Sequence, residues 1–279
     1  KEMDVEKYVD EMKEFYKFIL DIFDNDYQTD IIQINYYLDN KKLEQNHEKL
    51  KHFLYLLSKV SENHHKKRDF YDIVYHIILY YQNPIRQIFT NTEIFHLFKF
   101  NKPIIHFLIK NKILVLDKNL INEIIEKSKY FSHFLYPEIK EIADEKISQK
   151  IEKEMLQNDP DVFDDFEKKR QEGENEKYIC KLIRDDLVED FISYANQNNL
   201  KLDKIKILPT IFETNAFLMS KNVTLIEYAT FFGSIKIFNY LHNQDIELKP
   251  SLWLFSIHSQ NAEFIEILEN ENIEFPDNK

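Results

Sequence analysis

One short stretch decides the fold: residues 224–233, which read TLIEYATFFG. Thr224 followed three residues later by Glu227 is a capping box, in which each side chain bonds the backbone N–H of the other residue. The apolar residues that follow have helical spacing, and Gly233 can adopt the left-handed conformation that ends a helix. The stretch therefore predicts a short helix that begins after Thr224 and ends at Gly233.

An apolar pattern that follows this helix occurs four times along the chain. The copy that begins at Ile237 is apolar at its first, second, fourth and fifth residues, and again at its tenth and twelfth. The pattern returns at Phe264 and occurs earlier at Ile104 and Phe191. Each copy predicts a second short helix, a polar turn and an extended anchor. A unit of this size cannot bury its apolar face alone, so we expect neighbouring units to stack.

The copies also predict equivalent residues at the helix ends. Ser251 follows Thr224 at the interval that separates Phe264 from Ile237, and it is expected to replace Thr224 as the helix cap. Asn261 lies within a residue of the position equivalent to Gly233, and Asn101 does the same in the early copy. Asn is the next best residue for a left-handed turn, so we expect both to adopt that conformation.

Residues 224–233 resemble the ankyrin signature, in which Thr-Pro-Leu-His-x-Ala opens the first helix and Gly closes it. The residues from Ile237 to Leu241 are similar to the Ile-Val-x-Leu-Leu of the second ankyrin helix. The run PSLWL at 250–254 resembles more closely a divergent ankyrin-like family of protozoan parasites with no assigned activity. The resemblance covers residues 178–279, and implies a protein-interaction scaffold without catalytic activity.

The chain departs from the ankyrin pattern at three points. Leu225 stands where ankyrins have Pro, and Glu227 stands where they have His. The interval from Ile237 to Phe264 is shorter than the ankyrin repeat, which has a length of roughly 33 residues. We therefore expect short turns in place of the usual β-hairpins.

The expected fold is an all-α helical solenoid. Residues 1–137 are interpreted as an N-terminal helical region, with degenerate repeats left open as an alternative. Residues 138–176 hold 14 acidic and seven basic residues and are interpreted as a charged helix and linker. Residues 177–279 are expected to form ankyrin-like repeats. Because the last copy is as apolar as its predecessors, we expect the natural protein to continue into further repeats.

Composition excludes several classes of function. The chain has only two glycines, so it holds no phosphate-binding loop and no dinucleotide fingerprint. Its net charge of −12 disfavours nucleic acid as a partner, and its basic run, residues 64–68, is short and followed at once by Asp69. No apolar run is long enough to span a membrane.

The sequence predicts no catalytic, cofactor-binding or metal-binding residue. The ten histidines lack metal-ligand spacing, and no cofactor is expected. Lys177, Lys181 and Arg184 could lower the pKa of Cys180, but its apolar neighbours favour a buried helix position. A single cysteine cannot form an internal disulfide, which favours a cytoplasmic location.

We therefore expect a non-catalytic protein-interaction module whose partner is unknown. The predicted binding residues are aromatic or imidazole side chains on the first helices, where ankyrin-like stacks turn a concave face: Tyr228, Phe231, Phe232, Phe255 and His258. The alternative interpretation is that they fill gaps between thin repeats. In that case the binding face lies at the turn tips near Lys249 and Asn222.

Two other functions stay open. An enzyme with its site in residues 1–150 would be indicated by a perturbed acid/base pair in a deep pocket. A lipid-binding or membrane-surface module would be indicated by a basic amphipathic face, against which the acidic balance argues.

Overall fold

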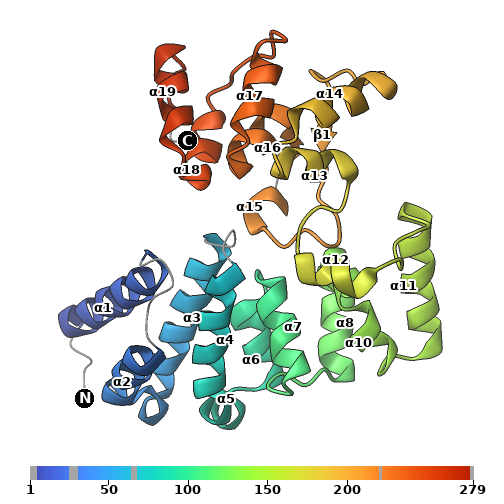
Figure 1. Ribbon diagram of the computed structural model, residues 1–279. Helices are drawn as coiled ribbons and strands as arrows, with labels where there is room; N and C mark the ends of the chain where they lie inside the picture. The colour runs from blue at the N-terminus through green and yellow to red at the C-terminus, as the bar shows by residue number, and fades with distance from the viewer. Residues whose placement is uncertain (1–4, 25–30, 64–67, 220–221, 277–279) are drawn as a thin grey trace. The chain divides into compact units, whose positions relative to one another are not determined.

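The computed structural model describes residues 5–24, 31–63, 68–219 and 222–276. The regular structure of these residues is almost entirely α-helical (Figure 1), which confirms the all-α class. The chain divides into two compact units. Unit 1 comprises Lys1–Gln171 with Thr214–Ala216, and unit 2 comprises Glu172–Glu213 with Phe217–Lys279.

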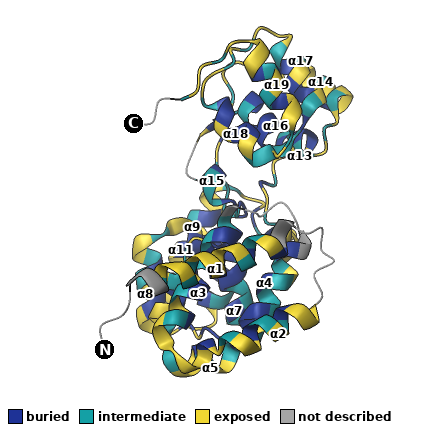
Figure 2. Cartoon of the chain, turned by 90° about the vertical axis from the view of Figure 1, so that its left-hand side faces the viewer, coloured by how far each residue is buried: buried dark blue, intermediate teal, exposed yellow. Residues whose placement is uncertain are grey.

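Unit 1 is a set of helices that carry both buried and exposed residues (Figure 2). The predicted apolar stripes form its core, because Phe15, Phe53 and Leu57 are fully buried. Helix α3 packs against α1, α4 and α6. The elements of this part of the chain are α1 (Val5–Asp24), α2 (Ile31–Lys41), the 3-10 helix η1 (Leu43–Gln45), α3 (His47–Asn63), α4 (Arg68–Tyr80), α5 (Gln82–Ile88), α6 (Asn91–Phe98), α7 (Lys102–Lys110), α8 (Lys118–Lys127), α9 (Lys129–Phe134), α10 (Tyr136–Lys140), α11 (Glu145–Asn158) and α12 (Phe166–Glu172).

The segment expected to be a charged helix and linker belongs to unit 1 as far as Gln171, and its charged helix is α11. Within unit 1, Arg170 donates two hydrogen bonds to Glu138, of 2.7 and 2.8 Å, and another to the carbonyl oxygen of Phe134. Its apolar residues Ile139 and Ile151 are buried. The high charge density that suggested a linker belongs instead to the outer side of packed helices.

Unit 2 consists of three helix pairs. Helix α13 packs on α16, α14 on α17 and α16 on α18, so the pairs form a row in chain order (Figure 1). Lys206 and Ile207 pair antiparallel with Thr224 and Val223 in a short two-stranded sheet. The elements are α13 (Tyr178–Arg184), α14 (Val188–Gln197), β1 (Lys206–Ile207), α15 (Ala216–Met219), β2 (Val223–Thr224), α16 (Leu225–Phe232), α17 (Ile235–His242), α18 (Leu252–Ser259) and α19 (Ala262–Asn270).

Residues 224–233 fold as predicted, into a capped helix that ends at Gly233. The backbone N–H of Thr224 donates to the Glu227 carboxylate at 2.7 Å, and the N–H of Glu227 donates to the Thr224 hydroxyl at 3.2 Å. Gly233 has φ +78° and ends α16. A Cβ at Gly233 would meet no atom within 4 Å, so the glycine is required by its backbone conformation and not by close packing.

The next pair repeats these elements in register, since α18 follows α16 at the same interval at which α19 follows α17. Two expectations for its helix ends are wrong. Ser251 precedes α18 with backbone angles in the α region, and its side chain does not cap the helix; its hydroxyl donates to Glu227 at 2.7 Å. Gln260, with φ 54°, holds the left-handed turn, because the Asn261 side chain is used as the N-cap of α19. Asn101 is likewise extended and caps α7.

A second left-handed turn is shared by all four copies of the apolar pattern. Each copy places a residue with φ between 49° and 57° eight positions after its first apolar residue. The residue that follows then bonds back to the preceding helix in three copies, through the N–H groups of Ile113, Leu200 and Ile273. The turn therefore directs the chain from the second helix toward its anchor. The four left-handed residues are Lys112, Asn199, Asp245 and Asn272.

Neighbouring pairs are joined by a hydrogen-bonded cap. Asp186, in the turn between α13 and α14, accepts from the N–H groups of Lys236 and Ile237 at 3.1 and 3.0 Å. These are among the first N–H groups of α17, which have no partner inside the helix. The first pair therefore supplies the N-terminal cap of a helix in the second.

We predict that Gly233→Val lowers the free energy of unfolding of unit 2 by about 1–2 kcal/mol, because a β-branched residue is strained at positive φ. Gly233→Asn is the matched control and should cost less, since Asn tolerates this conformation. Urea unfolding of the three proteins measures both effects. Equal stability of all three would show that the turn imposes no left-handed constraint.

We predict that unit 1 loses stability in acid through Glu138. Burial raises the pKa of this carboxyl, but hydrogen bonds from His106 and Arg170 outweigh burial and hold it at about 2. A carboxyl with a lowered pKa stabilises the fold above its unfolded-state pKa, near 4.5, and this contribution is lost as the pH falls toward 2.

Glu138→Gln should therefore flatten the loss of stability between about pH 4.5 and 2 and should cost about 1–3 kcal/mol at neutral pH, because Arg170 then keeps only the largely exposed Glu167 as its charged partner. Glu141→Gln, at an exposed position on the same segment, is the control. Urea unfolding across this pH range is the measurement, and parallel curves for the wild type and Glu138→Gln would contradict the assignment.

Candidate protein-interaction surface

The structure buries most of the predicted binding residues. Tyr228, Phe231 and Phe255 are at most 1% exposed, and Phe232 and His258 are half-buried. The expectation that the five side chains form an exposed face is therefore wrong for Tyr228, Phe231 and Phe255. A buried aromatic ring is not available to a partner unless unit 2 opens.

The reason is an aromatic layer between the second and third helix pairs. The rings of Phe231 and Phe255 lie 6.5 Å apart at their centroids, on α16 and α18 respectively. Phe217 stacks on Phe231 at 5.9 Å and meets Phe255 edge-on at 5.0 Å. The imidazole of His258 lies 4.3 Å from the Phe217 ring, at the edge of this layer. The alternative interpretation, in which these residues fill the space between thin repeats, describes their positions.

Tyr228 and Cys180 lie in the interior of the first two pairs. The Tyr228 hydroxyl accepts a hydrogen bond from Arg184 at 3.0 Å. Burial raises the pKa of the Cys180 thiol to about 12, although the Arg184 charge lowers it. A thiol with this pKa is protonated at neutral pH and is a poor nucleophile, so Cys180 is a core residue of α13, as its neighbours predicted.

The predictions about metal ligands, membrane spans, the basic run and an acid/base pair are compared here with the described residues. Among them, no three His, Cys, Asp or Glu side chains are grouped to hold a metal ion, and no helix is long and apolar enough to cross a bilayer. Residues 64–67 of the basic run lie outside the described part of the chain. Within residues 1–150, the lowered pKa of Glu138 keeps that carboxyl ionised, opposite to the shift of a general acid.

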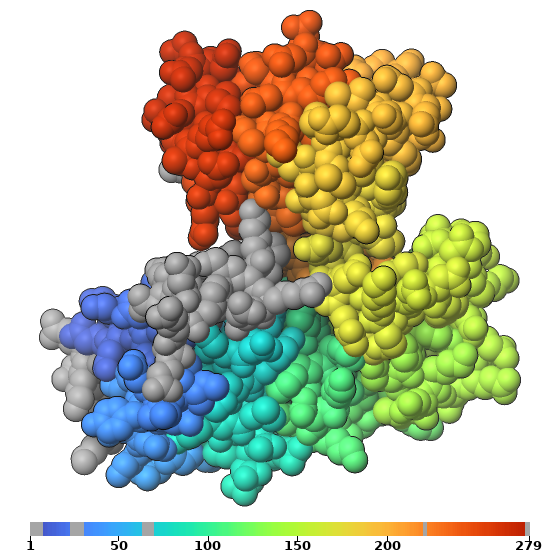
Figure 3. Space-filling model, in the orientation of Figure 1, coloured from blue at the N-terminus to red at the C-terminus, as the bar shows by residue number. Residues whose placement is uncertain are grey.

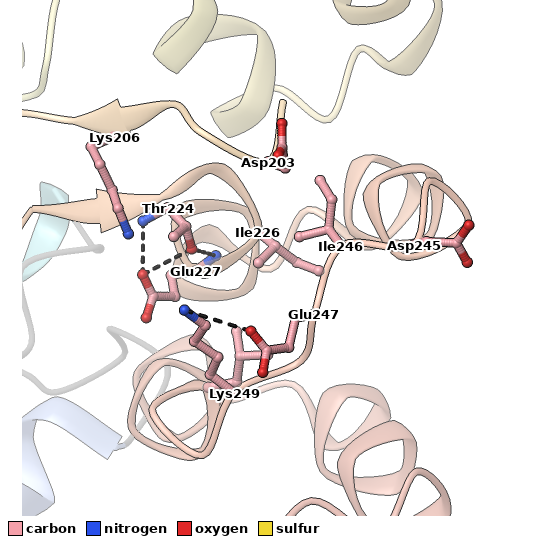
Figure 4. Close-up of a pocket in the computed structure, with 10 residues that line it drawn as sticks. Asp203, Lys206, Thr224, Ile226, Glu227, Asp245, Ile246, Glu247 and Lys249 are labelled. Atoms are coloured by element: carbon pink, nitrogen blue, oxygen red, sulfur yellow. Dashed lines mark hydrogen bonds and ion pairs between the residues drawn. The ribbon is translucent and has the colours of Figure 1, made fainter. Parts of the chain in front are cut away.

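Of the turn tips that were the alternative binding region, the one at Lys249 lines a small pocket of about 280 Å³ (Figure 4), and Asn222 does not line it. It lies between the β1–β2 ladder, the start of α16 and the turn that leads to α18. Its lining residues are Asp203, Lys206, Thr224, Ile226, Glu227, Asp245, Ile246, Glu247, Lys249 and Leu252.

The half-buried carboxylate of this pocket already has partners on both oxygens. One oxygen of Glu227 accepts from the N–H and the hydroxyl of Thr224, and the other accepts from Ser251. Burial raises the pKa of Glu227, but these hydrogen bonds outweigh burial and lower it below the ordinary value. Lys249 lies 3.7 Å from the Glu247 carboxylate, and both side chains are exposed. The pocket therefore joins two helix pairs through its own hydrogen bonds.

A different surface, which the sequence did not single out, is exposed and apolar. It lies on the last helix pair, the red segment that ends the row of unit 2 (Figure 3). Leu254 is 39% exposed, Ile257 60% and Phe275 67%, and Ile265 is half-buried. We call these four residues the α18 end face: Leu254, Ile257, Ile265 and Phe275.

The repeat register explains why this face is open. In the register that places α18 on α16, Ile257 is equivalent to Thr230 and Ile265 is equivalent to Phe238. Thr230 and Phe238 are each only 1% exposed. These positions are covered in the second pair, on which the third pair packs. Comparing the copies could have found the face, because Ile257 is apolar where the preceding pair has Thr230.

Within the end face, Phe275 packs against Trp253. The indole of this buried residue stacks on the Phe275 ring at 4.1 Å and 15°, and its N–H donates to the carbonyl oxygen of Ile273 at 3.0 Å. Phe275 thus keeps a fixed position although most of its ring is exposed. Exposed aromatic rings are enriched in protein-binding surfaces.

No family model, no curated protein and no solved structure matches the chain. The ankyrin-like resemblance of residues 178–279 therefore stays a prediction, and so does the function that it implies.

We predict that Phe255→Ala destabilises unit 2 by about 3–5 kcal/mol, because it opens a cavity in the aromatic layer. Leu241→Ala, at a fully buried position of α17, should cost a similar amount, about 2–5 kcal/mol. Ile257→Ala is the control and should cost under about 1 kcal/mol, since its side chain is largely exposed. Urea unfolding distinguishes the three variants. A Phe255→Ala protein as stable as the wild type would show that the Phe255 ring is exposed and not part of the core.

Proposed function

We propose that the chain is a non-catalytic protein-interaction module, and that the helix pairs of unit 2 are ankyrin-like repeats stacked as a solenoid. The repeat assignment is supported by the common register of α16 and α17 with α18 and α19, and by the capping box and left-handed Gly233. The Thr224–Glu227 box and the left-handed glycine occupy the positions at which the ankyrin signature has its cap and its closing glycine.

The observation that carries the function is the α18 end face. Three of its side chains are more than a third exposed, and all four are apolar. Exposed apolar side chains that gather on one surface mark interaction sites, because water leaves them when a partner binds. An aromatic ring at such a site commonly contributes a large part of the binding free energy.

The location that we propose is the cytoplasm. The chain has one cysteine, and that cysteine is buried as a free thiol in the core of unit 2. A core built around a free thiol suits a reducing compartment.

An affinity-capture experiment with the intact chain tests the function. We expect the wild type to retain a protein partner and the double variant Leu254→Ser, Ile257→Ser to lose it, because both changes remove apolar area from the end face. The matched control is Tyr178→Ser, which alters a residue of unit 2 that is 54% exposed but lies on α13. All three proteins are first shown to have the same helical content by circular dichroism.

Retention of the same proteins by the wild type and the double variant would contradict binding through the end face. Loss of capture by the Tyr178→Ser control alone would move the binding surface to α13.

A further inference from the structure

We infer that the first helices of the second and third pairs form a binding site for an aromatic side chain of a partner protein, and that Phe217 of α15 occupies this site as a ligand supplied by the chain itself. The site consists of Phe231 on α16 and of Phe255 and His258 on α18. It shares no residue with the α18 end face, so the inference goes beyond the proposed function.

The contacts of the Phe217 ring define what the site accepts. The ring lies within 9° of parallel to Phe231, with 5.9 Å between the centroids, and meets Phe255 edge-on at 5.0 Å. The imidazole of His258 lies 4.3 Å from the Phe217 ring. Stacked and edge-on contacts both use the charge distribution of a flat ring, so the site favours an aromatic side chain over an aliphatic one.

The site opens to solvent at its edge. Phe231 and Phe255 are at most 1% exposed, whereas Phe217 and His258 are half-buried. The ring that occupies the site is therefore reachable from outside, unlike the two rings on which it rests. Release of α15 is the opening of unit 2 that would expose them, and it leaves the packing of α16 on α18 in place.

The occupant does not belong to the repeated helix pairs. Residues 243–251 suffice to connect α17 to α18, but residues 198–224 connect α14 to α16, and α15 lies within this longer connection. The pairing of β1 with β2 closes the base of the connection, so α15 can leave its site while the base stays paired. Ala216, the first residue of α15, belongs to unit 1, and Phe217 begins the next part of unit 2. Helix α15 is thus an addition to the row of pairs.

A ligand attached to its own site competes with ligands in solution. At four residues, α15 is too short to be a stable helix by itself. Its position depends on Phe217 and on Leu218, which is 4% exposed. A side chain on a short flexible tether acts at a roughly millimolar effective concentration. A partner that joins an aromatic residue to further contacts can therefore displace it.

Peptide binding by the full chain tests the inference. The probe is the end-blocked peptide NAFLM, the sequence of residues 215–219, and its matched control is NAALM. We expect Phe217→Ala to bind NAFLM about tenfold more tightly than the wild type, because the competing ring is gone, and neither protein to bind NAALM. Tyr178→Ala, which changes an exposed aromatic residue of α13, should bind like the wild type. Binding is followed by the imidazole proton resonances of His258, which a ring bound in the site shifts.

Thiol alkylation tests the release of α15 with the Phe217 ring in place. Leu218→Cys puts a thiol at a buried position of α15, and the native Cys180 is a buried thiol in the core of unit 2. We expect the thiol on α15 to react at least about 100-fold faster than Cys180, because α15 opens without the rest of unit 2. An excess of NAFLM should accelerate this reaction further, since the peptide holds α15 out of its site, and NAALM should not.

Each result supports or overturns the inference. Equal binding of NAFLM and NAALM by Phe217→Ala would show that the site does not select a ring. Equal affinity of the wild type and Phe217→Ala for NAFLM would show that Phe217 does not occupy the site. A Phe217→Ala chain that loses helical content by circular dichroism also overturns the inference, because the ring then belongs to the core. So does alkylation on α15 at the rate of Cys180.

Discussion

The organisation of unit 2 depends on carboxylates that bond the backbone or side chain of a neighbouring helix pair. Asp186 of the first pair caps α17 in the second, and Glu227 of the second pair caps its own helix and accepts from Ser251 of the third. Unpartnered N–H groups at a helix start are costly when they are sheltered from water, so each cap has a preferred position. These caps fix the register in which one pair lies on the next.

Packing of aromatic side chains between the helix pairs adds to the contacts made by the caps. The helices of these pairs are short, and large aromatic rings lie between them. Phe217, Phe231 and Phe255 form this filling, and Arg184 satisfies the hydroxyl of Tyr228 in the neighbouring layer. Stability in such a row comes mainly from contacts between adjacent pairs. Among the described residues, the third pair packs on the second, and Leu254 and Ile257 of α18 are exposed.

The sequence predicted those features that a single element determines. The capping box at Thr224, the left-handed Gly233 and the constant register of the last two helix pairs are local patterns, and the structure contains all three. It did not predict which neighbour would cover each apolar residue. Tyr228 and Phe255, expected at the surface, are therefore buried, since helical periodicity shows that a face is apolar but not whether another helix lies on it.

The predictions for the charged segment and for the turn residues differ from the structure for a related reason. Residues 138–171 resemble a linker in composition, but the Arg170–Glu138 pair and the buried Ile151 appear only in three dimensions. The left-handed conformation of Lys112 and Gln260 could not be predicted from residue type, because neither is typical of it. Ser251 was expected to be a cap, and the competing acceptor Glu227 lies 24 residues away in the chain.

The placement of two unique side chains makes unit 2 observable by itself. The only tryptophan, Trp253, and the only cysteine, Cys180, both belong to unit 2 and are both buried. Indole fluorescence excited apart from tyrosine therefore reports on unit 2 alone, and alkylation of the thiol records each opening of its core. Because the indole stacks on Phe275, the same emission also senses any molecule that covers that ring. The protein thus carries its own optical probe for folding and for occupancy.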